Sequence, residues 1–168
     1  PFNGNALEAV GCIGTVYNFL GFIDDTPEKQ GKNKYGHSVF TREELKKYPK
    51  RRIKQLLMDQ TAIAGIGNIY SDEICFYAKV DPSKQINNLT IKQIGLLFEG
   101  IKKILSRAIE LRGSSVDNYV DTEGAKGDYV KELKVYDKEG EKCNEGKGII
   151  KRIKLGSRSS YFCPECQK

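Results

Sequence analysis

The stretch IKQLLMDQTAIAGIGNIYSDE, from Ile53 to Glu73, decides how the rest of the chain is organised. Three apolar residues of its first part share one helical face: Ile53, Leu56 and Leu57. Gly65 and Gly67 permit a tight reversal with positive φ, and Asn68 stands where the N-cap of a second helix belongs. The pattern predicts a helix–turn–helix whose second helix offers free backbone N–H groups to a phosphate.

A basic rim lies beside this predicted turn. Lys50, Arg51 and Arg52 form a run of cations, and Lys54 follows just beyond. Spacing alone leaves two interpretations open. The segment is either an ordinary corner between two helices, with Asn68 as a structural cap, or a helix–turn–helix that holds an anionic backbone.

The composition fits a small basic protein. The 168 residues carry a net charge of +6 and a pI near 9.0, which suits an anionic partner without requiring one. The apolar runs are too short to cross a bilayer, and the N-terminus shows no secretion signal. Five cysteines are an odd number, and the spacing Cys163-x2-Cys166 indicates a metal or redox pair rather than a disulfide framework. We therefore expect one or two small domains in a reducing cytoplasm.

Residues 1–39 are the least informative part of the sequence. The apolar, β-branched segment 10–23 predicts one or two buried strands, and the polar segment 24–37 predicts an exposed loop. Cys12 lies in the apolar segment and is interpreted as a packed side chain. His37, the single histidine of the chain, has a loop context and is a poor candidate for catalysis or metal binding.

Two capping boxes predict further helices. The pattern TREE from Thr41 opens a short helix that ends near Tyr48. Thr90 with Gln93 opens the longest helix, which Gly113 terminates. Seven apolar residues at three- and four-residue spacing form the predicted core face of that helix: Ile91, Ile94, Leu97, Phe98, Ile101, Leu105 and Ile109.

The stretch IKQLLMDQ followed by AGIGNIYSDE resembles the helix–two-turn–helix signature of the formamidopyrimidine-DNA glycosylase / endonuclease VIII (Fpg/Nei, MutM) family of base-excision repair enzymes. The matching continues from about residue 40 to Lys168. The resemblance implies a mostly α fold in three parts: a short β-rich remnant over 1–39, a helix–two-turn–helix DNA-binding domain over 40–131 and a small β-hairpin zinc finger over 132–168. It also implies a bacterial-type, nucleoid-associated cytoplasmic monomer without a membrane partner, which binds double-stranded DNA carrying a damaged base or an abasic site.

The same resemblance assigns DNA-binding roles to four residues. Lys54 and Asn68 match positions that hold backbone phosphates around the extruded nucleotide, and Lys50 is a further candidate for this role. Arg158, in the turn before YFCPEC, matches the arginine at the tip of the finger, which contacts phosphate and is assigned to the elimination step. Because arginine keeps its proton at neutral pH, stabilising charge on the departing phosphate is its easier role. The alternative for Arg158 is a solvated turn residue.

The glycine-rich segment 113–129 has two interpretations. By itself it is a mobile surface connection. In the family that the chain resembles, the matching segment is a loop that folds over an extruded damaged base, and base excision requires such closure. The resemblance makes four residues candidates for this lesion-capping loop: Ser114, Ser115, Thr122 and Tyr129.

The C-terminal segment resembles the zinc finger of the family, in which two C-x2-C pairs hold the metal. Cys143, Cys163 and Cys166 match three of the four ligands, but Gly146 stands where the fourth thiolate belongs. Three outcomes stay open for a site that wants four ligands. Water or a carboxylate such as Glu145 completes the coordination shell of the metal, the metal binds weakly, or side-chain packing alone stabilises the hairpin.

The catalytic residues of the family match this chain less well. The resemblance calls for an N-terminal proline that attacks C1′, a glutamate directly after it and a lysine from a β-sandwich domain. Pro1 is a weak candidate for the nucleophile because Phe2 replaces the glutamate, and some forty residues do not supply a sandwich. The chain is therefore interpreted as the C-terminal half of such an enzyme or as a truncated homologue.

The function implied by the resemblance is damaged-DNA binding and base-excision repair, within a bifunctional DNA glycosylase / AP lyase that acts on oxidised or ring-opened purines. Two rival functions stay open. One is a non-catalytic DNA-binding module derived from the family. The other is an RNA- or ribosome-associated zinc-ribbon protein, since basic helical units with fingers occur there too.

Overall fold

The computed structural model describes residues 45–63, 65–114 and 127–168. The elements in these ranges are α3 (Ile53–Leu57), α4 (Asn68–Tyr77), the 3-10 helix η1 (Ile86–Asn88), α5 (Ile91–Glu110), the 3-10 helix η2 (Tyr129–Glu132) and the strands β1 (Lys151–Leu155) and β2 (Arg158–Phe162). The helices and the antiparallel hairpin confirm the predicted mostly helical fold with a small β unit. The segment 1–39, with Cys12 and His37, lies outside the described residues.

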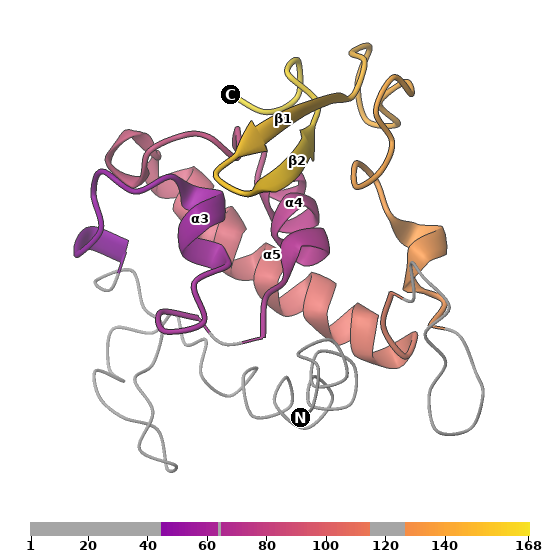
Figure 1. The fold of residues 1–168 in the computed structure, drawn as a ribbon, viewed down its shortest axis with the longest axis horizontal. Coiled ribbons are helices and arrows are strands. Elements are labelled where there is room, and N and C mark those ends of the chain that lie inside the picture. Colours follow the sequence, from indigo (N-terminus) through magenta and orange to yellow (C-terminus); the bar gives the residue numbers. More distant parts are fainter. Residues whose placement is uncertain (1–44, 64, 115–126) are drawn as a thin grey trace.

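Helix α4 is the central element of the described fold. Figure 1 shows the β1–β2 hairpin on one side of α4 and the long helix α5 on the other, with α3 beside α4. Gly100 of α5 permits a close approach between α4 and α5, because a β-carbon there would lie 2.9 Å from Cδ1 of Tyr77. The hydroxyl of Tyr77 also donates a hydrogen bond to Glu99. These contacts fix α5 against the end of α4.

Two clusters of buried side chains meet on α4. Ile74 and Cys75 belong to the larger cluster, which α3, α4 and α5 build together. The next residue, Phe76, joins the smaller cluster of the finger. That cluster contains Phe76, Val135, Cys143, Ile150, Tyr161 and Cys163. Because α4 buries apolar surface toward both sides, it holds the finger against the helical domain.

Helix α3 begins through tertiary contacts rather than through a side-chain cap. Arg52 occupies its N-cap and makes no capping hydrogen bond with its side chain. Instead, the N–H of Ile53 donates to the carbonyl of Lys84 at 2.9 Å, and the N–H of Lys54 donates to the carbonyl of Pro82 at 3.3 Å. A later segment thus satisfies backbone donors that the start of a helix leaves free.

The turn between α3 and α4 is closed by the side chain of Gln60. It accepts from the N–H of Gly65 at 2.9 Å and donates to the carbonyl of Ile66 at 3.0 Å. Gly65 has a φ of 92°, whereas Gly67 has a φ of −95° and is extended. The prediction that Asn68 caps α4 is wrong, because the extended backbone of Gly67 occupies the N-cap and Asn68 is the first helical residue.

The long helix α5 confirms the predicted capping box. The N–H of Gln93 donates to Oγ1 of Thr90 at 3.1 Å, and the N–H of Thr90 donates to Oε1 of Gln93 at 3.1 Å. The helix ends shortly before Gly113, which has a φ of 87° and confirms the predicted stop. Ile91 departs from the predicted core face and is 79% exposed, because the buried residues of α5 begin only at Leu97.

The N-terminal edge of the described chain shows the end of the short helix predicted from Thr41. The N–H of Tyr48 donates to the carbonyl of Leu45 at 3.1 Å. Residues 41–44, which include the predicted capping box, lie outside the described residues. Among the helices that the structure does describe, none is both long enough and apolar enough to cross a membrane.

Candidate DNA interface and metal centre

The β1–β2 hairpin presents Arg158 at its tip. Leu155 pairs with Arg158 across the hairpin, so the turn consists of Gly156 and Ser157. Gly156 has a φ of 66°, and a β-carbon there would lie 3.6 Å from Nε2 of Gln55 in α3. The tip therefore lies against α3, as Figure 1 also shows, while Arg158 stays exposed. The exposed basic residues of β1 are Lys151, Arg152 and Lys154.

A buried ion pair lies beneath this hairpin. Nζ of Lys54 in α3 lies 2.8 Å from Oδ1 of Asp72 in α4, and the side chains are 1% and 0% exposed. Lys54 also donates to the carbonyl of Ser159 at 2.9 Å. Asp72 accepts from Oγ of Ser160 at 2.6 Å and from the N–H of Tyr161 at 3.0 Å. The pair therefore ties α3, α4 and β2 together, and the ammonium of Lys54 points into the protein.

The two charges of this pair depend on each other. Burial lowers the pKa of Lys54, while the charge of Asp72 and its hydrogen bond oppose that shift. Burial likewise raises the pKa of Asp72, against the charge and hydrogen bond of Lys54. The positive charge of Arg158 at the hairpin tip further lowers the pKa of Lys54. Removing either partner would leave a buried charge without compensation.

A second buried carboxylate holds the segment that enters the finger. Glu73 accepts three backbone hydrogen bonds, from the N–H groups of Lys134 at 2.9 Å and of Val135 and Tyr136 at 3.0 Å each. Burial raises the pKa of Glu73, and the three N–H donors oppose that shift. Two adjacent residues of α4 thus hold two parts of the finger. Asp72 binds β2, and Glu73 binds the backbone of residues 134–136.

Asp72 and Glu73 are residues of this site that sequence reasoning missed. The available signal in the sequence was two neighbouring acids directly before the apolar residues Ile74, Cys75 and Phe76, and the structure buries all of residues 71–76. Buried carboxylates are rare unless they are paired or hydrogen-bonded. Such an acidic pair therefore points to partners elsewhere in the chain, although it does not name them.

Asn68 lies at the first turn of α4, one turn before Asp72. Its Oδ1 atom is buried and has no hydrogen-bond partner among the described residues. Its side chain contacts Tyr136, where burial raises the pKa of the hydroxyl and the hydrogen bond to Asn68 lowers it. A buried amide oxygen without a partner is a costly feature, and such features concentrate at functional sites.

Lys50 is exposed just before α3. Its neighbour Arg51 forms an ion pair with Asp59, with Nη1 2.6 Å from Oδ2, and its guanidinium lies 5.4 Å from the ring centroid of Tyr48. The basic rim that the sequence predicts is therefore divided between an exposed lysine and an arginine that braces the turn. The phosphate-binding roles predicted for Lys50, Lys54, Asn68 and Arg158 stay predictions.

The structure describes the two ends of the predicted lesion-capping loop. Oγ of Ser114 lies 3.3 Å from the hydroxyl of Tyr70, and the ring of Tyr70 packs edge-on against Tyr129 at 5.5 Å. Tyr129 is only 4% exposed and anchors the end of the loop in the core. Ser115 and Thr122 lie outside the described residues, as do Pro1 and Phe2.

Three cysteine side chains converge in the finger. The sulfur atoms of Cys143, Cys163 and Cys166 all lie within 4.8 Å of one another, and those of Cys143 and Cys166 are 3.5 Å apart. Tetrahedral zinc with Zn–S bonds of about 2.3 Å places its sulfur ligands roughly 3.8 Å apart. The three thiols therefore fit three corners of such a site. A β-carbon at Gly146 would lie 2.5 Å from Sγ of Cys166, so residue 146 faces the same cluster.

The thiols differ in their surroundings. Although burial raises the pKa of Cys163, hydrogen bonds from the N–H of Cys166 and from the neighbouring thiols bring it below its ordinary value. Burial and the neighbouring thiols raise the pKa of Cys166 to about 12. Glu145, which the sequence offers as a fourth ligand, instead forms an ion pair with Lys79.

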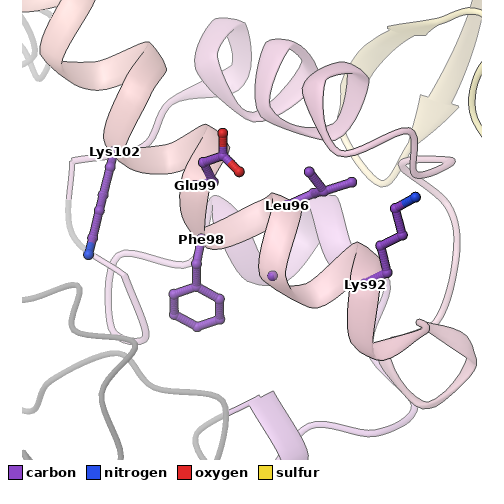
Figure 2. A pocket seen from close by; sticks show the side chains of 6 residues that line it. Lys92, Leu96, Phe98, Glu99 and Lys102 are labelled. Atoms are coloured by element: carbon purple, nitrogen blue, oxygen red, sulfur yellow. The ribbon is translucent and has the colours of Figure 1, made fainter.

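A shallow hollow of about 480 Å³ lies along α5, away from the hairpin. Figure 2 shows Lys92, Glu99 and Lys102 around it, with side chains that point in different directions. Leu96 and Phe98 supply most of its apolar wall. A binding site for a small molecule needs polar groups that converge, so this hollow gives no candidate active site.

The sequence of these two regions matches two known protein-family descriptions. Residues 29–120 match the formamidopyrimidine-DNA glycosylase H2TH domain, and residues 140–168 match the zinc finger found in FPG and IleRS. The first match covers more than half of the chain and includes α3, α4 and α5. The second covers the hairpin and the three converging cysteines.

Curated relatives agree with both matches. The formamidopyrimidine-DNA glycosylase of Listeria innocua serovar 6a is 49% identical over 118 residues, which are 70% of this chain and 43% of that protein. The formamidopyrimidine-DNA glycosylase of Pelotomaculum thermopropionicum is 45% identical over 133 residues, which are 77% of this chain and 48% of that protein. This chain thus spans about half the length of the curated relatives it matches.

Solved structures give the same result for the fold. The Lactococcus lactis Fpg in complex with abasic-site DNA superposes with a TM-score of 0.71 at 39% identity, over 92% of this chain and 55% of that chain. The MutM (Fpg) protein of Thermus thermophilus superposes with a TM-score of 0.72 at 30% identity, over 82% of this chain and 54% of that chain. The chain therefore belongs to the formamidopyrimidine-DNA glycosylase family and carries its H2TH domain and zinc-finger region.

Proposed function

We propose that this chain binds double-stranded DNA at a damaged base or an abasic site during base-excision repair. It does so as part of a bifunctional DNA glycosylase / AP lyase that acts on oxidised or ring-opened purines. The observation that carries the proposal is the buried Lys54–Asp72 pair, which holds the hairpin of Arg158 against α3 and α4. The similar Lactococcus lactis Fpg is bound to abasic-site DNA, and a similar MutM to DNA containing carbocyclic 8-oxo-G.

The phosphate contacts in this proposal come from exposed or partly exposed groups. Arg158 stands at the hairpin tip and Lys50 stands before α3, both exposed to solvent. Asn68 stands at the start of α4, where free N–H groups favour an anion. Lys54 contributes by holding the hairpin, since its own side chain is 1% exposed.

The segment 113–129 is the lesion-capping loop of this proposal. Its ends are held together, because the N–H of Tyr129 donates to the carbonyl of Gly113 at 3.1 Å. Ser114, Ser115 and Thr122 offer small polar groups to an extruded base, and Tyr129 anchors the loop. A loop with fixed ends can close over a base and exclude water without moving the core.

The chemical role of Arg158 in this proposal is electrostatic. Its guanidinium stays protonated at neutral pH, so it stabilises negative charge on the phosphate that departs during strand cleavage. Imine formation at C1′ needs an amine nucleophile, for which Pro1 is the weak candidate in this chain.

The proposed experiment separates binding from catalysis. The chain is incubated with a duplex that contains an abasic site and then with borohydride, while binding to a tetrahydrofuran analogue is measured in parallel. We expect tighter binding to the analogue duplex than to undamaged duplex, and no covalent product from this chain. A trapped product that disappears when the Pro1 amine is blocked would show that the chain is catalytic. Stronger binding to structured RNA than to lesion duplex would contradict the proposed partner.

Zinc completes the proposed finger. The family match over residues 140–168 supports zinc binding, and Cys143, Cys163 and Cys166 would hold the ion. Bound zinc would fix the far end of the hairpin, so that Arg158 is held from both ends. The cysteines at 75, 143, 163 and 166 are free thiols, which fits the reducing cytoplasm where we place the protein.

A further inference from the structure

The finger has an open corner at Gly146. The β-carbon that Gly146 lacks would lie 2.5 Å from Sγ of Cys166, which is too close for both atoms, so a side chain at this position would join the group of three thiols only if the Cys166 side chain shifted. Glycine leaves that space without a donor atom. Gly148 is also close to the cluster, because a β-carbon there would lie 2.8 Å from Sγ of Cys163. The backbone of this turn therefore runs directly along the metal-binding group.

No described residue with a carboxylate or imidazole takes the place of the missing ligand. Among the histidine, cysteine, aspartate and glutamate side chains that the structure describes, Cys143, Cys163 and Cys166 alone form a group close enough to hold one ion. Glu145 is paired with Lys79. Gln167 is also engaged, because it accepts from the N–H of Cys163 at 2.8 Å and donates to the carbonyl of Val80 at 2.8 Å.

The open corner faces solvent. Residues 144–147 are all exposed, whereas Cys143 and Cys163 are buried below them. A ligand from solution can therefore approach at Gly146 without displacing the core. This differs from a structural zinc site with four protein ligands, which is closed, and corresponds to the arrangement of sites that keep one exchangeable position.

We propose that the metal centre of this finger keeps an exchangeable coordination position at Gly146, which a small thiol from solution can occupy. The inference rests on the proposed zinc site. Zinc favours four ligands and binds thiolates well, so water fills the position until a thiol replaces it. In this exchange the thiol releases its proton to solvent, its sulfur forms a bond to the metal, and the water leaves. The metal and the sulfur keep their oxidation states.

Cobalt(II) is the probe for this proposal, because its absorption bands report the number of thiolates around it. The metal-free chain receives one equivalent of cobalt(II) without oxygen, and 2-mercaptoethanol is then titrated. In the wild type we expect the thiolate-to-cobalt and d–d bands to change and to saturate at one thiol for each cobalt. Gly146→Cys should show the saturated spectrum from the start, ignore added thiol and bind cobalt roughly tenfold more tightly or better.

Gly146→Ala is the matched control, because its β-carbon forces the same shift of the Cys166 side chain as Gly146→Cys but supplies no donor, so the spectrum should stay responsive to thiol. A wild type that binds cobalt with a four-ligand spectrum and ignores thiol would overturn the inference and leave the zinc proposal standing. Failure of the wild type to bind cobalt, while Gly146→Cys binds it, would show that three thiols do not hold the metal. That result would overturn the zinc proposal and this inference together.

Discussion

Nζ of Lys54 lies 2.8 Å from Oδ1 of Asp72, and both side chains are inside the protein. The pair joins α3 to α4, and β2 closes over it through Ser160 and Tyr161. In this position the ammonium of Lys54 is buried and also donates to the carbonyl of Ser159 in the hairpin. We therefore expect a substitution of Lys54 to change DNA affinity by changing the position of Arg158.

The buried pair should be important for stability. We expect Lys54→Met alone to lower the free energy of unfolding by about 3 to 5 kcal/mol, because Asp72 is then left buried and charged. The double variant Lys54→Met/Asp72→Asn should recover part of that loss. Urea denaturation of the three proteins measures both effects. If Lys54→Met lowers the free energy of unfolding by less than about 1 kcal/mol, the pair contributes no more than an exposed ion pair does. That result would contradict the buried geometry.

The positions of Lys54 and Arg158 predict a coupled effect on DNA affinity. Arg158→Ala should reduce the slope of log affinity against log salt by about one phosphate contact, and Lys92→Ala on α5 should leave it unchanged. If Lys54 affects DNA binding only by holding the hairpin in place, Lys54→Met should add little to the loss of DNA affinity that Arg158→Ala causes. Fluorescence titrations at several salt concentrations complete the double-mutant cycle.

Additive losses in that cycle would show that Lys54 contacts a phosphate itself. Because Lys54→Met is expected to be unstable, Ser160→Ala serves as a milder variant. It removes the hydrogen bond to Asp72 of 2.6 Å but leaves the ion pair intact. The losses of DNA affinity caused by Ser160→Ala and Arg158→Ala should likewise be less than additive in the double variant.

Asp59 should make the turn between α3 and α4 sensitive to acid. Hydrogen bonds from Thr61 and Arg51 hold the pKa of Asp59 well below its ordinary value. Because the folded pKa is below the unfolded one, the ionised carboxylate stabilises the fold above about pH 4, and this contribution is lost as the pH falls further. Asp59→Asn should therefore lower the free energy of unfolding by about 1 kcal/mol at neutral pH. The difference from wild type should shrink below about pH 4, and a constant difference would contradict the assignment.

The capping box of α5 gives a local test of stability. Thr90 and Gln93 exchange hydrogen bonds of 3.1 Å in both directions. Thr90→Ala should lower the free energy of unfolding by about 1 kcal/mol, whereas Thr90→Ser keeps the hydroxyl and should be nearly neutral. Thermal or urea unfolding checks both variants. Equal losses in the two variants would mean that the methyl group of Thr90, not its hydroxyl, supports the helix.

The sequence by itself determined the parts of this protein that depend on near neighbours. The capping box joins Thr90 to Gln93, three positions later, and Gly113 ends α5 through its own φ of 87°. The reversal at Gly65 and the pair Cys163 and Cys166 are equally local. Such features follow from propensity, capping and backbone geometry, which the order of residues fixes directly.

Tertiary structure alone decided the features whose partners are distant in the chain. Lys54 and the carbonyl of Ser159 are 105 residues apart, and Asp72 and Ser160 are 88 residues apart. The family resemblance placed Lys54 on a backbone phosphate, whereas the structure buries its ammonium against Asp72. Its burial depends on packing α3, α4 and β2 together, and packing makes a charge internal only when its partner arrives from elsewhere. No local pattern around Lys54 carries that information.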